Sequence, residues 1–133
     1  MRARVVIYNC QTQALLLIHR LKDGRDYWVV PGGGAKDQET PVQTAIREVR
    51  EELQIVLTPK DLHQLFVLQE QEREVFFCAQ SVQATTPKIS GEEKERSNSA
   101  NSYLPTWVKF SKLSQLNLMP PQAKLKINEY LKN

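Results

Sequence analysis

A predicted amphipathic helix over residues 41–53 restricts the fold of this 133-residue chain more than any other feature. Thr40 supplies a hydroxyl N-cap, and Pro41 suits the first helical position. Apolar side chains then recur at steps of three and four residues and form one stripe: Val42, Ala45, Ile46, Val49 and Leu53. Because such a stripe must be buried against another element, the rest of the chain has to supply an apolar surface.

Segments with the character of strands lie on both sides of this helix. They cover residues 4–8, 14–20, 27–30, 62–68, 74–82 and 104–110, and an Asp-Gly pair marks a turn over residues 21–26. Residues 121–131 form a second helical pattern, with apolar positions at Ala123, Leu125, Ile127 and Leu131. This order of elements predicts a mixed α/β class with helices packed on a sheet. We expect residues 1–133 to form a single domain.

The composition is that of a globular protein. Apolar residues make up 41% of the chain and charged residues 25%, which is too apolar for a disordered chain. The longest apolar run, residues 14–18, is far shorter than the ~20 residues of a membrane-spanning helix, so no membrane association is expected. The net charge of +3 comes from scattered basic residues. Nucleic acid is therefore not the expected partner, and the alternative of a basic nucleic-acid-binding protein predicts strongly salt-dependent binding.

Two cysteines, Cys10 and Cys78, bear on the redox compartment. Neither has a second cysteine or a histidine at the spacing of a metal site. Both lie in segments with strand character, so we expect buried, reduced thiols that pack like small apolar residues. Reduced thiols are typical of the cytoplasm, which is the expected location.

Three glutamates gather on one face of the first predicted helix. Glu48, Glu51 and Glu52 stand at i, i+3 and i+4, and like charges at i, i+4 destabilise a helix by roughly 0.2–0.5 kcal/mol per pair. Carboxylates near the helix C-terminus also oppose its dipole. The arrangement is explained if Mg²⁺ or Mn²⁺ binds there, because these cations prefer carboxylate oxygens. The alternative is a solvated acidic face, in which Arg47 and Arg50 moderate the repulsion.

The wider spacing of these residues resembles a known motif. In chain order it consists of Gly33, Glu39, Arg47, Glu48, Val49, Glu51, Glu52 and Ile55. This pattern over residues 33–55 resembles the Nudix box of the MutT-like Nudix hydrolases. The resemblance implies a Nudix-type α/β/α sandwich with a mixed central sheet. It also implies a pyrophosphohydrolase that cleaves the diphosphate bond of a nucleoside diphosphate linked to another group. The alternative is a non-catalytic domain of the same fold that binds nucleotide as a sensor.

The resemblance also implies roles for the residues of the motif. Mg²⁺ or Mn²⁺ would be bound by Glu51 and Glu52, with Glu48 as a further ligand or as the base that orients water. The carbonyl of Gly33 would be a backbone ligand. Some members of the family take the base from a later loop, where Glu92 and Glu95 are the candidates here. The alternative for these two is a solvated polar loop.

Arg47 and Glu39 would position the site. Arg47 would hold a neighbouring carboxylate for catalysis, and Glu39 would fix the loop against the helix. The sequence departs from the family pattern at Gln54, where glycine is usual, and at Lys36 and Gln38, where an acidic residue and a glycine are frequent. If Gln54 adopts a left-handed conformation, its side chain costs ~1–2 kcal/mol.

The substrate is less constrained than the reaction. The stretch after the motif lacks the proline and tyrosine marks of some subfamilies, which favours a nucleoside triphosphate or a nucleotide sugar. Arg20 ends the second predicted strand and suits phosphate. Four aromatic residues suit base stacking: Tyr27, Trp28, Tyr103 and Trp107. The alternative is that the aromatic residues pack in the core and Arg20 faces solvent. The expected partner is a nucleotide-type small molecule, and the expected state is a monomer or homodimer.

Overall fold

The computed structural model describes residues 1–80 and 101–131. Its strands and helices follow one another in this order: β1 (Arg2–Asn9), β2 (Ala14–Lys22), β3 (Arg25–Val29), β4 (Gly32–Gly34), α1 (Pro41–Leu53), η1 (Pro59–Asp61), β5 (His63–Gln69), β6 (Arg73–Gln80), β7 (Asn101–Lys109), η2 (Phe110–Gln115), β8 (Leu118–Met119) and α3 (Pro121–Leu131). The bounds predicted for the two helices, 41–53 and 121–131, are confirmed.

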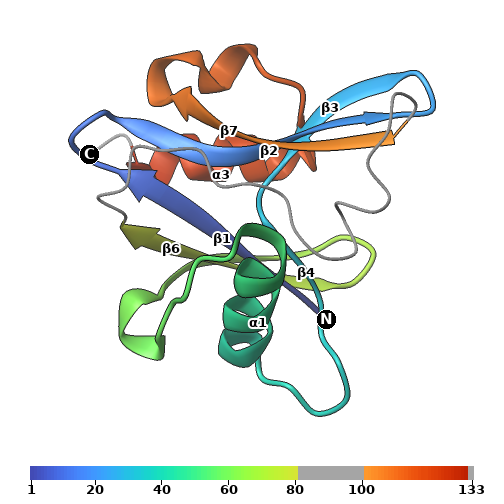
Figure 1. Cartoon of the computed structure of the whole chain (residues 1–133), viewed down its shortest axis with the longest axis vertical. Coiled ribbons are helices and arrows are strands. Elements are labelled where there is room, and N and C mark those ends of the chain that lie inside the picture. Colours follow the sequence, from blue (N-terminus) through green and yellow to red (C-terminus); the bar gives the residue numbers. More distant parts are fainter. Residues whose placement is uncertain (81–100, 132–133) are drawn as a thin grey trace.

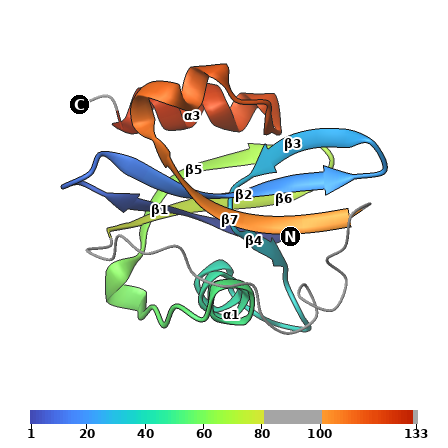
Figure 2. The same ribbon diagram turned by 45° about the horizontal axis from the view of Figure 1, so that its top comes forward.

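The strands form a central layer between the two helices, with α1 on one side and α3 on the other (Figure 2). Alternate residues of β1 separate two apolar cores: Val5 belongs to the core under α1 and Val6 to the core under α3. Val49 of α1 and Ile127 of α3 are both fully buried in their respective cores. The predicted α/β/α sandwich is therefore confirmed.

The sheet is mixed, as predicted. Its strand order is β5-β6-β1-β2-β3-β8, with β4 paired to β1 and β7 paired to β2. The pairs β1–β6 and β3–β8 are parallel, and the remaining pairs are antiparallel.

Two central strands separate along their length. β1 pairs with β2 only through residues 7–9, and its first residues pair with β4 instead. The later part of β2, residues 18–22, pairs with β3. β4, which pairs with the first residues of β1, therefore lies apart from β3 and β7, which pair with β2 (Figure 1). This separation creates the space in which the candidate site lies.

Local sequence explains how α1 begins and ends. Thr40 and Gln43 form a capping box, in which each side chain bonds the backbone N–H of the other. Gln54 ends the helix in the left-handed conformation, with φ 58° and ψ 29°, and its N–H donates to the carbonyl of Arg50. The left-handed conformation that was considered for Gln54 from the sequence is therefore present in the structure.

Several local predictions were wrong. Strands β2 and β3 extend through most of the predicted turn and leave only Asp23 and Gly24, both with positive φ, as the hairpin loop. Strand β4, formed by Gly32, Gly33 and Gly34, was not predicted, and only Gly32 among them has positive φ. Strand β7 begins at Asn101, and neither β8 nor the two 3-10 helices was predicted. Cys10 is exposed in the β1–β2 turn, whereas the sequence predicted a buried thiol. None of the helices within the described ranges is long and apolar enough to cross a bilayer.

Candidate active site

A cleft of about 510 Å³ opens between the two separated groups of strands. One wall is formed by β2, β3 and β7, which contribute Arg20, Tyr27 and Tyr103. The opposite wall is formed by β4, the segment after it and α1. It contributes the glycines 32–34, Lys36, Glu48, Glu51 and Glu52. The cleft thus places an arginine and two tyrosines opposite three carboxylates.

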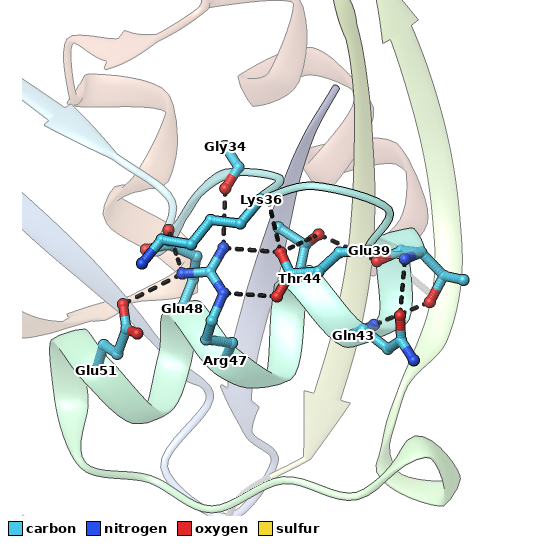
Figure 3. Close-up of polar contacts among 9 residues, drawn as sticks. Gly34, Lys36, Glu39, Gln43, Thr44, Arg47, Glu48 and Glu51 are labelled. Atoms are coloured by element: carbon cyan, nitrogen blue, oxygen red, sulfur yellow. Dashed lines mark hydrogen bonds and ion pairs between the residues drawn. The ribbon is translucent and has the colours of Figure 1, made fainter.

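Arg47 is the centre of a polar network on α1 (Figure 3). Its Nε and Nη2 donate to the two carboxylate oxygens of Glu39 at 2.7 and 2.9 Å, and Nη2 also donates to the carbonyl of Gly34 at 2.9 Å. Its Nη1 donates to Glu48 at 3.1 Å and to Glu51 at 3.2 Å. One guanidinium therefore joins the loop before α1 to two carboxylates of the helix.

The partners of Glu39 fix its ionisation state as well as its position. The hydrogen bonds from Arg47, together with that from the backbone N–H of Lys36, lower the pKa of Glu39 from 4.5 to about 2. In return, the hydrogen bond to Glu39 raises the pKa of Arg47. Thr44, which is fully buried on α1, places its hydroxyl 3.1 Å from the same carboxylate. The ion pair thus stays charged over the physiological pH range.

Glu52 is the buried member of the carboxylate group. Its residue is only 7% exposed, and its Oε1 accepts a hydrogen bond from the backbone N–H of Gly32 at 3.3 Å. A buried carboxylate is costly unless hydrogen bonds or a cation offset its lost hydration. Because Glu52 also lines the cleft, a cation in the cleft would face a preformed anionic group.

Gly33 gives Glu48 the room it needs. A Cβ at position 33 would lie 2.6–2.8 Å from the carboxylate of Glu48. Any side chain there would displace Glu48 from the cleft wall. Gly32 is required for a different reason, because a Cβ there would lie 2.1 Å from the backbone oxygen of Ala3 on the neighbouring strand.

The donor set suits Mg²⁺ or Mn²⁺, although the carboxylates do not converge on one point. Within residues 1–80 and 101–131, no three His, Cys, Asp or Glu side chains are grouped as metal ligands. Instead, the Arg47 guanidinium lies between Glu48 and Glu51 as their counter-charge. Carboxylate oxygens and a nearby backbone carbonyl are the ligands that such cations take. Glu51, whose side chain is 45% exposed, has the freedom to leave Arg47.

Arg20 dominates the opposite wall. It is 8% exposed, its guanidinium carbon lies 3.5 Å from the ring centroid of Tyr103, and its Nη2 donates to Asn101 at 2.8 Å. Its Nε is buried and has no hydrogen-bond partner within the described ranges. Cross-strand pairing explains the contacts, because Arg20 of β2 lies opposite Tyr27 of β3 and Tyr103 of β7.

The structure does not bring all the sequence-predicted residues together. Trp28 lies on the other side of the sheet, where it packs against the core under α3 and stacks on His19 with centroids 4.3 Å apart. The period of two along β3 explains this, since neighbouring residues face opposite sides. Glu92 and Glu95 lie outside the described residues. Arg20 and Tyr103 do line the cleft, together with the four proposed metal ligands Gly33, Glu48, Glu51 and Glu52.

Sequence reasoning gave no site role to several cleft residues. Arg2 and Arg4 of β1 line the cleft although they precede the motif by about thirty residues, and Lys36 lines it from the segment after β4. No local pattern marks the two arginines, because strand pairing between β1 and β4 brings them there. Lys36 had a signal in the sequence, since it departs in charge from the family pattern.

Comparisons with known proteins identify the family of the chain. The sequence profile of the NUDIX domain matches residues 1–128. A curated relative, dihydroneopterin triphosphate diphosphatase of Escherichia coli (strain K12), is 35% identical over 72 residues, which cover 54% of this chain and 47% of the relative. The match thus spans about half the length of that relative.

Solved structures share the fold over nearly the whole chain. The E. coli dihydroneopterin triphosphate pyrophosphohydrolase superposes with a TM-score of 0.71 at 20% identity, over 99% of this chain and 94% of that one. A MutT structure, from work on Aliivibrio salmonicida and Vibrio cholerae, gives 0.70 at 16% identity, over 96% and 92%. At these identities the superpositions establish the fold, and the profile match establishes the family. The chain belongs to the NUDIX domain family.

Proposed function

We propose that the chain is a divalent-metal-dependent pyrophosphohydrolase. Its substrate would be a nucleoside diphosphate linked to another group, of the nucleoside triphosphate or nucleotide-sugar type, and its expected location is the cytoplasm. The observation that carries the proposal is the composition of the cleft. Three carboxylates of α1 line one wall, and a nearly buried arginine lies in the other.

The cation would be held on the α1 wall. Glu51, Glu52 and the carbonyl of Gly33 are the proposed ligands, and Glu48 is a further ligand or the base; all four residues line the cleft. When bound, Mg²⁺ or Mn²⁺ neutralises phosphate oxygens and makes a coordinated water more acidic. Without that charge, the three carboxylates repel a diphosphate.

The polar network supplies orientation and a proton acceptor. Glu39 and the Gly34 carbonyl hold Arg47, and Arg47 in turn holds Glu48 through its Oε1. The other oxygen of Glu48 can then accept a proton from water, as a general base must within hydrogen-bond reach. Glu92 and Glu95 remain sequence-based candidates for the same role.

Arg20 is the proposed phosphate-binding residue of the opposite wall. A guanidinium presents several N–H donors in a fixed plane, which suits phosphate oxygens. Tyr103, against which Arg20 stacks, and Tyr27 on the neighbouring strand give this wall aromatic surface for the organic part of a substrate. Trp28 is no longer a candidate for this contact, because it lies on the opposite side of the sheet.

The decisive experiment is a screen of nucleoside triphosphates and nucleotide sugars with Mg²⁺ and with Mn²⁺. We expect hydrolysis of at least one substrate, and loss of activity when EDTA removes the cation. Glu51→Gln and Glu52→Gln should each lower kcat by roughly 10²–10⁴-fold. Glu129→Gln on α3 is the matched control and should leave kcat unchanged.

Two results would contradict the proposal. Tight binding of one nucleotide without hydrolysis would identify a non-catalytic sensor. Unchanged Mg²⁺ affinity and turnover in both glutamine variants would remove the carboxylates of α1 from the mechanism. Calorimetry of Mg²⁺ binding is run beside the activity assay. A variant that still binds Mg²⁺ is folded, so its turnover cannot be attributed to a loss of folding.

A further inference from the structure

Two cations of the cleft have no acidic partner within the described residues. They are Arg20, in the wall formed by β2, β3 and β7, and Lys36, in the wall formed by β4 and α1. The other arginines of the site are paired: Arg47 with Glu39, Arg4 with Glu74 at 2.8 Å, and Arg2 with Glu72 at 3.0 Å. Arg20 and Lys36 therefore carry the positive charge that is left for a ligand.

Arg20 is short of acceptors for a side chain so deeply buried. Only its Nη2 donates within residues 1–80 and 101–131, to Asn101, and its buried Nε donates to nothing there. Leaving a buried charged donor without a partner costs more than the ~1–3 kcal/mol of a neutral group. The stack on Tyr103 and the bond to Asn101 hold the guanidinium in place, although neither contact supplies negative charge. An anionic ligand would supply it.

Hydrogen bonds fix the backbone of Lys36, whereas its ammonium has no acidic partner in the part of the chain that the structure describes. Its N–H donates to Glu39 at 2.8 Å, and its carbonyl accepts from the N–H of Glu39 at 3.0 Å. Figure 3 shows the side chain reaching across the Arg47 guanidinium in the direction of Glu48. Arg47 already forms ion pairs with Glu39, Glu48 and Glu51. The ammonium of Lys36 forms no ion pair within the described ranges.

The two charges favour a ligand with more phosphate charge than a diphosphate carries. Arg20 comes from the wall formed by β2, β3 and β7, and Lys36 comes from the opposite wall, which also carries the proposed cation ligands Glu48, Glu51 and Glu52. A cation held by these carboxylates would offset the charge of the two phosphates that the cleaved bond joins. Arg20 and Lys36 can then pair with a phosphate beyond that diphosphate. A nucleotide sugar offers them no such anion, because neutral sugars flank its diphosphate.

We propose that Arg20 and Lys36 make the cleft selective for a substrate with at least three consecutive phosphates, one of them terminal. This rests on the proposed function and narrows its substrate class to the nucleoside triphosphate type. A terminal phosphate carries about −1.5 to −2 charge at pH 7, whereas a phosphate esterified on both sides carries a single charge. The gain from two extra cations is therefore larger for a triphosphate.

Binding measurements test this selectivity without relying on turnover. Calorimetry with Mg²⁺ would compare α,β-methylene analogues of ATP, GTP, CTP and UTP with ADP-ribose and UDP-glucose. We expect at least one triphosphate analogue to bind tenfold or more tightly than either diphosphate compound. Arg20→Gln and Lys36→Gln should each weaken its binding by about tenfold to a hundredfold, the range of a hydrogen bond to a charged group. The double variant should lose most of the preference.

Matched variants remove the same charge elsewhere. Lys60→Gln on η1 and Arg73→Gln at the start of β6 change residues that do not line the cleft, and should bind all ligands like the wild type. Equal binding of both ligand classes, or a preference that survives in the double variant, overturns the inference. Selective binding without hydrolysis would support it while contradicting the proposed function. Hydrolysis of nucleotide sugars without a triphosphate preference would support the proposed function while contradicting this inference.

Discussion

Helices α1 and α3 cover opposite sides of one sheet, yet their buried surfaces differ in kind. The buried residues of α3 are Ala123 and Ile127, both apolar. Those of α1 include Thr44 and Glu52 beside three apolar residues. α1 also ends in a left-handed glutamine. Buried polar groups and backbone strain lower stability, and they persist where a site requires them. We therefore expect α3 to serve packing and α1 to carry the proposed chemistry.

Truncation of the α3 core should give the largest change in stability and no change in chemistry. Ile127→Ala should lower the free energy of unfolding by about 2–5 kcal/mol, because it removes a fully buried side chain. The kcat of the folded protein, measured at low temperature, should stay at the wild-type value. Urea unfolding followed by circular dichroism measures the first quantity. A reduced kcat in folded Ile127→Ala would show that α3 also shapes the site and would break the comparison.

Arg47→Lys should have the next largest effect, this time on the site. Lysine cannot bridge both oxygens of Glu39 and still reach Glu48 and Glu51, because it lacks the planar fork of arginine. We expect Mg²⁺ affinity, measured by calorimetry, to fall by roughly 10–100-fold, the usual cost of losing a group that orients metal ligands. Arg50→Lys, on the exposed side of α1, should bind Mg²⁺ normally. Equal affinities in the two variants would mean that Arg47 does not organise the carboxylates.

The same contrast explains what could be predicted from the sequence. The bounds of both helices follow from apolar periodicity, because each has one face on a sheet. Leu125, counted among the apolar positions of the second helix, is nevertheless 70% exposed. Strand β8 and the extension of β7 to Asn101 depend on pairing with β3 and β2, which no local pattern encodes. The carboxylates of α1 were identified because they are close in sequence. The cleft position of Arg4 was not, since the pairing of β1 with β4 creates it.

A pH series should show when the Glu39–Arg47 pair contributes to stability. Glu39 has a pKa of about 2 in the folded protein and 4.5 as its ordinary value. A lowered carboxylate pKa means that the stabilisation is complete above pH 4.5 and is lost as the pH falls toward 2. Glu39→Gln should therefore be less stable than wild type at pH 7, and the difference should shrink between pH 4.5 and 2. Urea midpoints across this range measure it, with Glu129→Gln as the control. A stability difference that does not change with pH would mean that Glu39→Gln acts through the shape of the side chain and not through its charge.

The smallest effect is expected at the end of α1. Gln54 holds φ 58° there, a conformation that costs a residue with a Cβ ~1–2 kcal/mol. Gln54→Gly removes this cost but adds ~0.4–1 kcal/mol of unfolded-state entropy, so a net stabilisation of about 0.5–1 kcal/mol is expected. Gln54→Ala keeps the Cβ and should bring no gain. Thermal unfolding of the two variants separates backbone strain from loss of the glutamine side chain. If Gln54→Gly is less stable than Gln54→Ala, the left-handed end of α1 is not strained, and this part of its difference from α3 disappears.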